Sequence, residues 1–293
     1  MHIRLAGALA LAVALLSATA GRAATADAPC SAAAIGAAHV LAPGITTRPL
    51  VIHSPCGVAV EGEIISGRSS GSHPGVLFVH WLGDPKTTNH TEFEADAIAL
   101  ARRGVTSVLI DAMWSRSDWF DKVGVSADAD IAQAKIQLGQ LSAALDLLER
   151  QKGVDARRIA YVGHDFGAMF GALLAGADAR PSYVVLMAGV PTLSEWYLLG
   201  KTHPDRETYV RALDGLDIAA ALRRSKARAF LFQFAAHDHY IAADRATGFA
   251  AAAPLPRTVA TYDADHSLAL PQADADRRAW LIEHLFEPAT ITP

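Results

Sequence analysis

An apolar run in the middle of the chain ends in a short segment with glycine at both ends. The apolar residues 159–162 lead into a segment that reads Gly163-His164-Asp165-Phe166-Gly167. A helical pattern of small residues follows over 168–175. A tight turn from a strand into a helix needs glycines, because the backbone is strained and its neighbours pack closely. Such a turn lifts its central side chain out of the sheet, so the sequence predicts that Asp165 is presented at a strand end.

Apolar runs and helical patterns alternate along the chain, which has 293 residues, of which 51% are hydrophobic. The patterns predict strands over residues 50–53, 58–65, 76–80, 105–110, 159–162, 183–187, 229–234 and 258–262. They predict helices over residues 92–103, 128–152, 168–175, 242–252 and 273–286. Strands that alternate with helices indicate the α/β class, with a mostly parallel sheet covered by helices on both faces.

The chain is predicted to have one large globular domain with additions. Residues 58–293 form this domain, and residues 25–57 form an N-terminal arm that includes the first strand. The alternation of strands and helices is interrupted over residues 190–226. Because about 35 residues are too few for an independent domain, this segment is predicted to be a short lid.

The first 24 residues have the pattern of a secretory signal peptide. Arg4 supplies the positive charge, residues 5–16 are apolar, and small residues follow as far as Ala23 and Ala24. The alternative is a membrane anchor, but the apolar run is shorter than the ~20 residues that span a bilayer. We therefore expect cleavage near Ala24, no stable membrane insertion afterwards, and a periplasmic or extracellular location.

The two cysteines and the net charge narrow the expected partners. Cys30 and Cys56 both precede the main domain, and in an oxidising compartment they are expected to form a disulfide; two free thiols are the alternative. Neither suggests a metal site. The formal net charge is −4 and no basic patch in the sequence suggests nucleic-acid binding, so no nucleic-acid partner is expected. A small-molecule substrate, with no metal or cofactor, is expected.

Polar residues that can act together follow several of the predicted strands. Asp238 comes shortly after the strand 229–234, and His266 comes shortly after the strand 258–262. Trp81 and Leu82 follow the early strand 76–80. The carboxyl ends of parallel strands meet at one edge of a sheet, where ligands bind in such folds. The order of Asp165, Asp238 and His266 is the chain order of nucleophile, acid and base in α/β-hydrolases.

From about residue 58 to residue 286 the chain resembles the α/β-hydrolase superfamily, and its framework is similar to dienelactone-hydrolase-like proteins. The segment around Asp165 is instead similar to the corresponding turn of epoxide hydrolases and haloalkane dehalogenases. The resemblance implies Asp165 as nucleophile, Asp238 as acid and His266 as base. It also implies an oxyanion hole formed by the amide of Phe166 with that of Trp81 or Leu82.

An aspartate in place of the usual serine changes the chemistry that is possible. A carboxylate that attacks an ester carbonyl forms a high-energy anhydride, whereas it can displace a halide or open an epoxide at saturated carbon. The first hypothesis is therefore a secreted hydrolase that forms an alkyl ester on Asp165. The alternatives are an ester or lactone hydrolase in which His266 activates water directly, and a binding protein without activity. Trp81, Trp196 and Tyr197 are predicted to contact the substrate.

Overall fold

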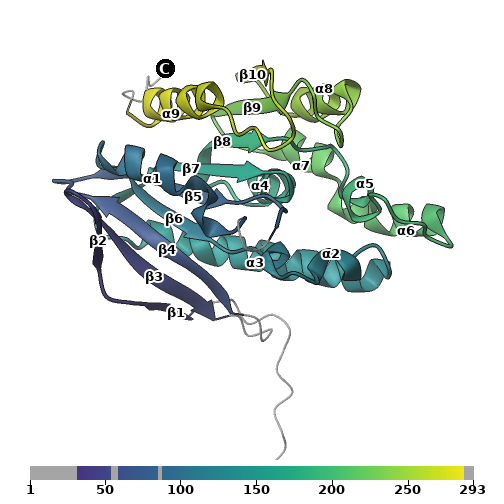
Figure 1. Ribbon diagram of the computed structural model, residues 1–293, viewed down its shortest axis with the longest axis horizontal. Coiled ribbons are helices and arrows are strands. Elements are labelled where there is room, and N and C mark those ends of the chain that lie inside the picture. The colour runs from purple at the N-terminus through teal and green to yellow at the C-terminus, as the bar shows by residue number, and fades with distance from the viewer. Residues whose placement is uncertain (1–31, 54–58, 85–87, 287–293) are drawn as a thin grey trace, which may run out of the picture.

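The computed structural model describes residues 32–53, 59–84 and 88–286 (Figure 1). The expected signal peptide, Cys30 and Cys56 lie outside these residues. The described strands form one sheet in the order β1-β3-β4-β6-β5-β7-β8-β9-β10, and β2 also pairs with β3. Their bounds are β1 Ala32–Ile35, β2 His39–Ala42, β3 Ile45–His53, β4 Val60–Gly67, β5 His73–Val79, β6 Thr106–Ile110, β7 Val154–His164, β8 Pro181–Met187, β9 Ala229–Ala235 and β10 Arg257–Tyr262.

The sheet is parallel from β6 to β10 and antiparallel in its N-terminal part. This arrangement confirms the predicted mixed α/β class with a mostly parallel central sheet. Every residue of β5 and β6 is buried. Parallel strands covered on both faces carry continuous apolar runs, which explains why these strands are recognisable in the sequence.

Helices cover both faces of the sheet (Figure 1). On one face α1 packs against β4 and β6, and α9 packs against β7, β8 and β9. On the other face α3 and α4 pack against the central strands, α7 packs against α4, and α8 packs against α7. The bounds are α1 Glu94–Ala101, α3 Ala127–Glu149, α4 Phe166–Ala177, α7 Ile218–Arg224, α8 Ala243–Ala252 and α9 Pro271–Phe286.

Shorter helices lie in the connections. The segment 190–226, predicted to be a short lid, contains α5, α6, η3 and α7. Of these, α5 and α6 extend from one end of the domain, and α2 lies below them (Figure 1). Their bounds, with those of the 3-10 helices, are α2 Trp119–Lys122, α5 Leu193–Tyr197, α6 Arg206–Ala212, η1 His90–Phe93, η2 Met113–Ser115 and η3 Leu213–Leu216. Within the described ranges, no helix combines the length and the apolar character needed to cross a membrane.

The N-terminal segment contains more of the sheet than the sequence predicts. One strand was expected before residue 58, but β1, β2 and the nine-residue β3 lie there, and all belong to the main sheet. The prediction was wrong because β1 and β2 have only four residues each, too few to show an alternating pattern. Backbone pairing with β3 makes them strands, so the described residues 32–53 contribute three strands to the main sheet.

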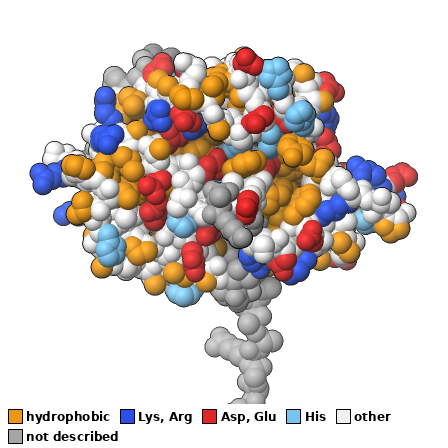
Figure 2. Space-filling model, in the orientation of Figure 1, with side chains coloured by type: hydrophobic (Ala, Val, Ile, Leu, Met, Phe, Trp, Pro, Cys, Tyr) orange, Lys and Arg blue, Asp and Glu red, His pale blue; other side chains and the backbone are white. Residues whose placement is uncertain are grey.

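The two charge types are mixed on the surface. On the face drawn in Figure 2, Lys and Arg side chains are interspersed with Asp and Glu, and hydrophobic side chains gather near α5 and α6. Exposed large hydrophobic residues include Tyr240, which is 56% exposed and whose ring centroid lies 5.1 Å from that of His266. This face therefore carries no broad basic surface, in agreement with the negative net charge of the chain.

We predict that Gly167→Ala destabilises the protein by about 1–3 kcal/mol. A Cβ at Gly167 would clash with the backbone carbonyl oxygen of Val79 and lie 2.9 Å from that of His80, so α4 and β5 would have to separate. Gly248→Ala in α8 is the matched control, because a Cβ there meets no atom within 4 Å and alanine favours a helix. Urea denaturation measures both. Equal effects from the two variants would contradict the close packing at Gly167.

Candidate active site

Asp165 lies on the tight turn between β7 and α4. Its backbone has φ 54° and ψ −115°, a left-handed conformation that is costly for a residue with a Cβ. The Asp165 amide donates a 2.8 Å hydrogen bond to the carbonyl oxygen of Met187 at the end of β8, which helps to hold the turn. The predicted strand–turn–helix is thus present, and strain of this kind persists at sites where the surrounding structure imposes it.

Two donors from different parts of the chain bind the carboxylate of Asp165. The amide of Leu82, in the loop after β5, donates to Oδ2 at 3.0 Å, and the indole Nε1 of Trp196, in α5, donates to Oδ1. Asp165 is only 2% exposed. Burial raises the pKa of Asp165, while the charges of His266 and His164 and the two hydrogen bonds oppose that effect only in part.

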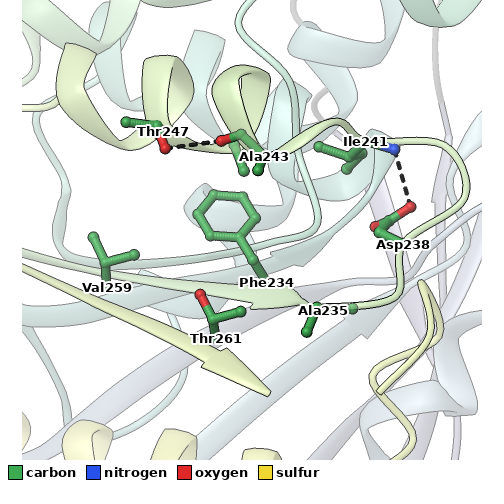
Figure 3. Close-up of a pocket in the computed structure, with 10 residues that line it drawn as sticks. Phe234, Ala235, Asp238, Ile241, Ala243, Thr247, Val259 and Thr261 are labelled. Carbon is green, nitrogen blue, oxygen red and sulfur yellow. Dashed lines mark hydrogen bonds between the residues drawn. The ribbon is translucent and has the colours of Figure 1, made fainter. Parts of the chain in front are cut away.

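His266 and Asp238 form a hydrogen-bonded pair beside this carboxylate. The His266 Nδ1 lies 2.7 Å from Asp238 Oδ2, and Asp238 Oδ1 accepts hydrogen bonds from the amides of Tyr240 (2.8 Å) and Ile241 (3.0 Å; Figure 3). Burial alone would raise the pKa of Asp238, but its hydrogen bond with His266 and the charge of His266 lower the pKa overall. Burial alone would lower the pKa of His266, yet Asp238 and the charge of Asp165 raise it overall.

The structure brings Asp165, His266 and Asp238 to the same sheet edge. The predicted contact of His266 with Asp238 is present, whereas in the described part of the chain no hydrogen bond joins His266 to Asp165, and the two interact through charge. Aromatic rings surround His266, with centroid distances of 5.9 Å to Trp81 and 5.8 Å to Trp196. Because Nδ1 is held by Asp238, Nε2 is the nitrogen that can take a proton from water.

Asp238 lines a cavity of about 190 Å³ that lies between β9, β10 and α8 (Figure 3). Its described lining is largely apolar and includes Phe234, Ile241 and Val259. Neither Asp165 nor His266 is among the described residues that line it. We therefore do not place the substrate there. Among the residues that the structure describes, no group of three or more potential ligands is arranged to hold a metal ion.

No family model matches the sequence, and no curated protein matches it. Solved structures do match. An acetyl xylan esterase from Paenibacillus aligns with a TM-score of 0.69 over 86% of this chain and 88% of that one, at 16% identity. Acetyl xylan esterase 1 from Thermoanaerobacterium also gives 0.69, over 87% and 88%, at 14% identity. A cold-adapted esterase from an Arctic intertidal metagenomic library gives 0.64, over 85% and 97%, at 16% identity.

The chain has the α/β-hydrolase fold. The predicted fold is confirmed by these neighbours, by the parallel half of the sheet and by the turn at Asp165. At such identities the likeness establishes the fold alone, because one fold supports many functions. The chemistry depends on the site residues.

Within this α/β-hydrolase fold, two of the predicted site residues lie differently from what we expected. The Trp81 amide, one of two candidates for the oxyanion hole, donates to Glu92 Oε2 at 2.8 Å, so Leu82 is the one directed at Asp165. Tyr197, a predicted substrate contact, is 0% exposed and packs with its ring against Trp119. The α5 helix turns Tyr197 into the core while the adjacent Trp196 faces Asp165, and sequence alone does not show which way this short helix faces.

The remaining predicted residues have the following surroundings. The Phe166 ring is buried against Trp114 and Trp119, and its backbone amide opens α4 next to Asp165. The Trp81 ring is partly exposed and stacks on His164 at 5.3 Å. The participation of the Phe166 amide in an oxyanion hole and of the Trp81 ring in substrate binding stay predictions.

The site also contains a second hydrogen-bonded pair, His164 with Glu92, that the sequence did not predict. The His164 ring lies 2.7 Å from Glu92 through Nδ1 and 3.0 Å from the carbonyl oxygen of His266 through Nε2. His164 is adjacent to Asp165, and this adjacency was the signal in the sequence. Glu92 lies 72 positions away in η1, and no local pattern connects it to the turn.

Proposed function

We propose that this protein is a hydrolase in which His266, oriented by Asp238, activates water that attacks an ester carbonyl beside Asp165. The observation that carries the proposal is the 2.7 Å His266–Asp238 hydrogen bond, at the same sheet edge as Asp165. A histidine held through Nδ1 by a carboxylate is arranged to act as a general base through Nε2. Two substrate classes are possible: in the first the attacked ester is the substrate itself, and in the second it is an alkyl ester formed on Asp165.

The first candidate substrate is a carboxylic ester or lactone, attacked directly by the activated water. The fold neighbours named as esterases support this class more than an epoxide or an organohalide. In this mechanism Asp165 accepts a hydrogen bond from the attacking water and thereby positions it, and no acyl-enzyme forms. The tetrahedral intermediate needs amide donors such as those of Leu82 and Phe166, so the substrate carbonyl would replace Asp165 at the Leu82 amide.

A second candidate is supported by the hydrogen bonds of the Asp165 carboxylate. One of its oxygens lies at the Leu82 amide and the other at the indole of Trp196. A carboxylate with one oxygen at a backbone donor can attack saturated carbon with the other, which breaks the carbon–halogen or epoxide carbon–oxygen bond and leaves an alkyl ester on Asp165. Water activated by His266 would then attack the Asp165 carbonyl, with its oxyanion at the Leu82 amide.

A single turnover in H₂¹⁸O, with enzyme in excess over substrate, separates the two candidates. Direct attack on a substrate ester places ¹⁸O in the acid product and leaves Asp165 unlabelled. Displacement by Asp165 places ¹⁸O in the Asp165 carboxylate, because water attacks there. Mass spectrometry of the peptide that carries Asp165 measures the label. Absence of turnover with esters, lactones, epoxides and organohalides alike would contradict both and favour a binding protein.

The protein is further proposed to act outside the cytoplasm. This proposal is supported by the sequence of residues 1–24 alone. We expect the mature chain to begin near Ala24 and to fractionate with periplasmic or extracellular proteins. Full-length protein in the cytosolic fraction would contradict this expectation.

A further inference from the structure

Behind Asp165, one buried histidine connects three loops of the site. The His164 side chain is fully buried, and the Glu92 side chain is 16% exposed. His164 reaches Glu92 Oε1 through Nδ1 (2.7 Å) and the His266 carbonyl oxygen through Nε2 (3.0 Å). The other Glu92 oxygen accepts the Trp81 amide at 2.8 Å. The loop after β5, the turn after β7 and the loop after β10 are therefore joined through one Glu92–His164 pair.

The partners of His164 determine its charge. A neutral imidazole has one nitrogen that donates and one that accepts, whereas a protonated imidazole donates from both. Both His164 nitrogens face acceptors, a carboxylate oxygen and a carbonyl oxygen. Two proton arrangements satisfy these hydrogen bonds: an imidazolium beside an ionised Glu92, and a neutral ring protonated at Nε2 beside a protonated Glu92 that donates to Nδ1. The other Glu92 oxygen accepts the Trp81 amide and the Glu92 side chain is 16% exposed, and both features stabilise a carboxylate over a carboxylic acid. With Glu92 ionised, His164 meets both of its acceptors only as a cation.

A second buried histidine in the same region shows the opposite pattern. His80 donates from Nδ1 to the Trp81 carbonyl oxygen at 2.8 Å, and its Nε2 accepts the Ala112 amide at 3.0 Å. One nitrogen therefore donates and the other accepts, which is the pattern of a neutral ring. Burial lowers the pKa of His80, in agreement with this pattern. The difference between the two histidines comes from their partners, since both are buried.

We propose that His164 is a positioning residue, held as an imidazolium by Glu92, which fixes the loops that carry Leu82 and His266 around Asp165. Its positive charge also favours the ionised form of the buried Asp165 carboxylate. The titratable groups that face His164 are Glu92 from η1, Asp165 at the turn and His266 from the loop after β10. The positioning role rests on the proposed function, whereas the charge state of His164 does not.

The charge of His164 can be measured in the resting protein, without a substrate. In ¹⁵N-labelled protein near pH 7, where an ordinary histidine is mostly neutral, we expect two protonated nitrogens on the His164 ring and one on the His80 ring. The variant His164→Gln assigns the signal by its loss, and through-bond correlations assign it independently. A His164 ring with one protonated nitrogen would overturn the proposal.

The variant Glu92→Gln tests the consequence of that charge. Its amide oxygen can still accept the Trp81 amide and its NH₂ group can donate to His164 Nδ1, so we expect the ring to become neutral. The matched control is Asp111→Asn, which makes the same change in the 2.7 Å pair between Asp111 and His90. We expect the His164 signals to stay unchanged in this control.

The positioning role is measured with 4-nitrophenyl acetate as a defined ester. We expect Glu92→Gln to lower kcat by about 10- to 100-fold, with a smaller change in KM, because misplaced groups slow the chemical step. In a plot of kcat against pH, the fall in activity on the acid side should move to higher pH in this variant. Losing a nearby cation raises the proton affinity of both Asp165 and His266. A lower kcat without this movement would indicate a structural role only. If the wild type does not hydrolyse the ester but His164 is cationic, the proposed substrate class fails and the charge assignment stands.

Discussion

The variant His266→Gln is expected to lower hydrolytic turnover by about 10²–10⁴-fold, the usual effect of losing a general base. Glutamine is similar in size and can still donate to Asp238, but it has no nitrogen that takes a proton from water. In the wild type the base is active when His266 is neutral. Because Asp238 and Asp165 together raise the pKa of His266 above its ordinary value despite its burial, activity should fall as the pH drops through this raised pKa.

The same variant distinguishes hydrolysis of a substrate ester from hydrolysis of an alkyl ester formed on Asp165. With an epoxide or organohalide substrate, displacement needs only the Asp165 carboxylate, so His266→Gln should accumulate an adduct on the peptide that carries Asp165. With a carboxylic ester attacked directly by water, no adduct should form at any time. Asp165→Asn should abolish the adduct, because a neutral amide is a poor nucleophile.

The control for this pair of variants is His237→Gln. His237 also pairs with an aspartate, Asp263, at 2.7 Å, but it is 69% exposed and belongs to a separate surface pair. Turnover in this control should remain close to wild type. Turnover by His266→Gln within a few-fold of wild type would rule out His266 as the base. Intact-protein and peptide mass spectrometry, taken along a single-turnover time course, measures the adduct.

The second large effect is expected from Arg277→Leu, which should lower the free energy of unfolding by about 3–5 kcal/mol. Arg277 in α9 is 3% exposed and binds Asp96 in α1 through Nη2 at 2.6 Å. Burial alone would lower the pKa of Arg277, but the charges of Asp96 and Asp274 raise it overall. Removing the guanidinium leaves Asp96 buried with one fewer partner, and an uncompensated buried charge is costly.

Two further variants distinguish this effect from a general loss of packing. Arg278→Leu removes the other partner of Asp96, which binds at 2.8 Å but whose side chain is 28% exposed, so its effect should be about 1 kcal/mol or less. The double variant Arg277→Leu/Asp96→Leu removes both buried charges and should recover much of the lost stability. Urea denaturation measures all three. A double variant less stable than Arg277→Leu would show that packing, not the unpaired charge, dominates.

Much of the fold could be predicted because its signals are local. The helix predicted over residues 128–152 is α3, Ala127–Glu149, and the strand predicted over 183–187 is β8, Pro181–Met187. A helix that is buried on one face and a strand that is buried on both faces each need a recognisable pattern of apolar residues, and both patterns are present here. The strands β1 and β2 are defined by pairing with β3, a property of the partner rather than of their own residues.

The α/β class, the turn at Asp165, and the strand ends that carry Asp238 and His266 could be predicted from the sequence, because alternation, glycines and chain order are local or linear properties. The groups that face Asp165 were set by the tertiary structure. It directed Leu82 rather than Trp81 at the carboxylate, placed Trp196 there and buried Tyr197, and joined Glu92 to His164. These contacts depend on how loops distant in the chain meet at one sheet edge, and on which side of a short helix packs inward. Neither property leaves a periodic pattern in the sequence.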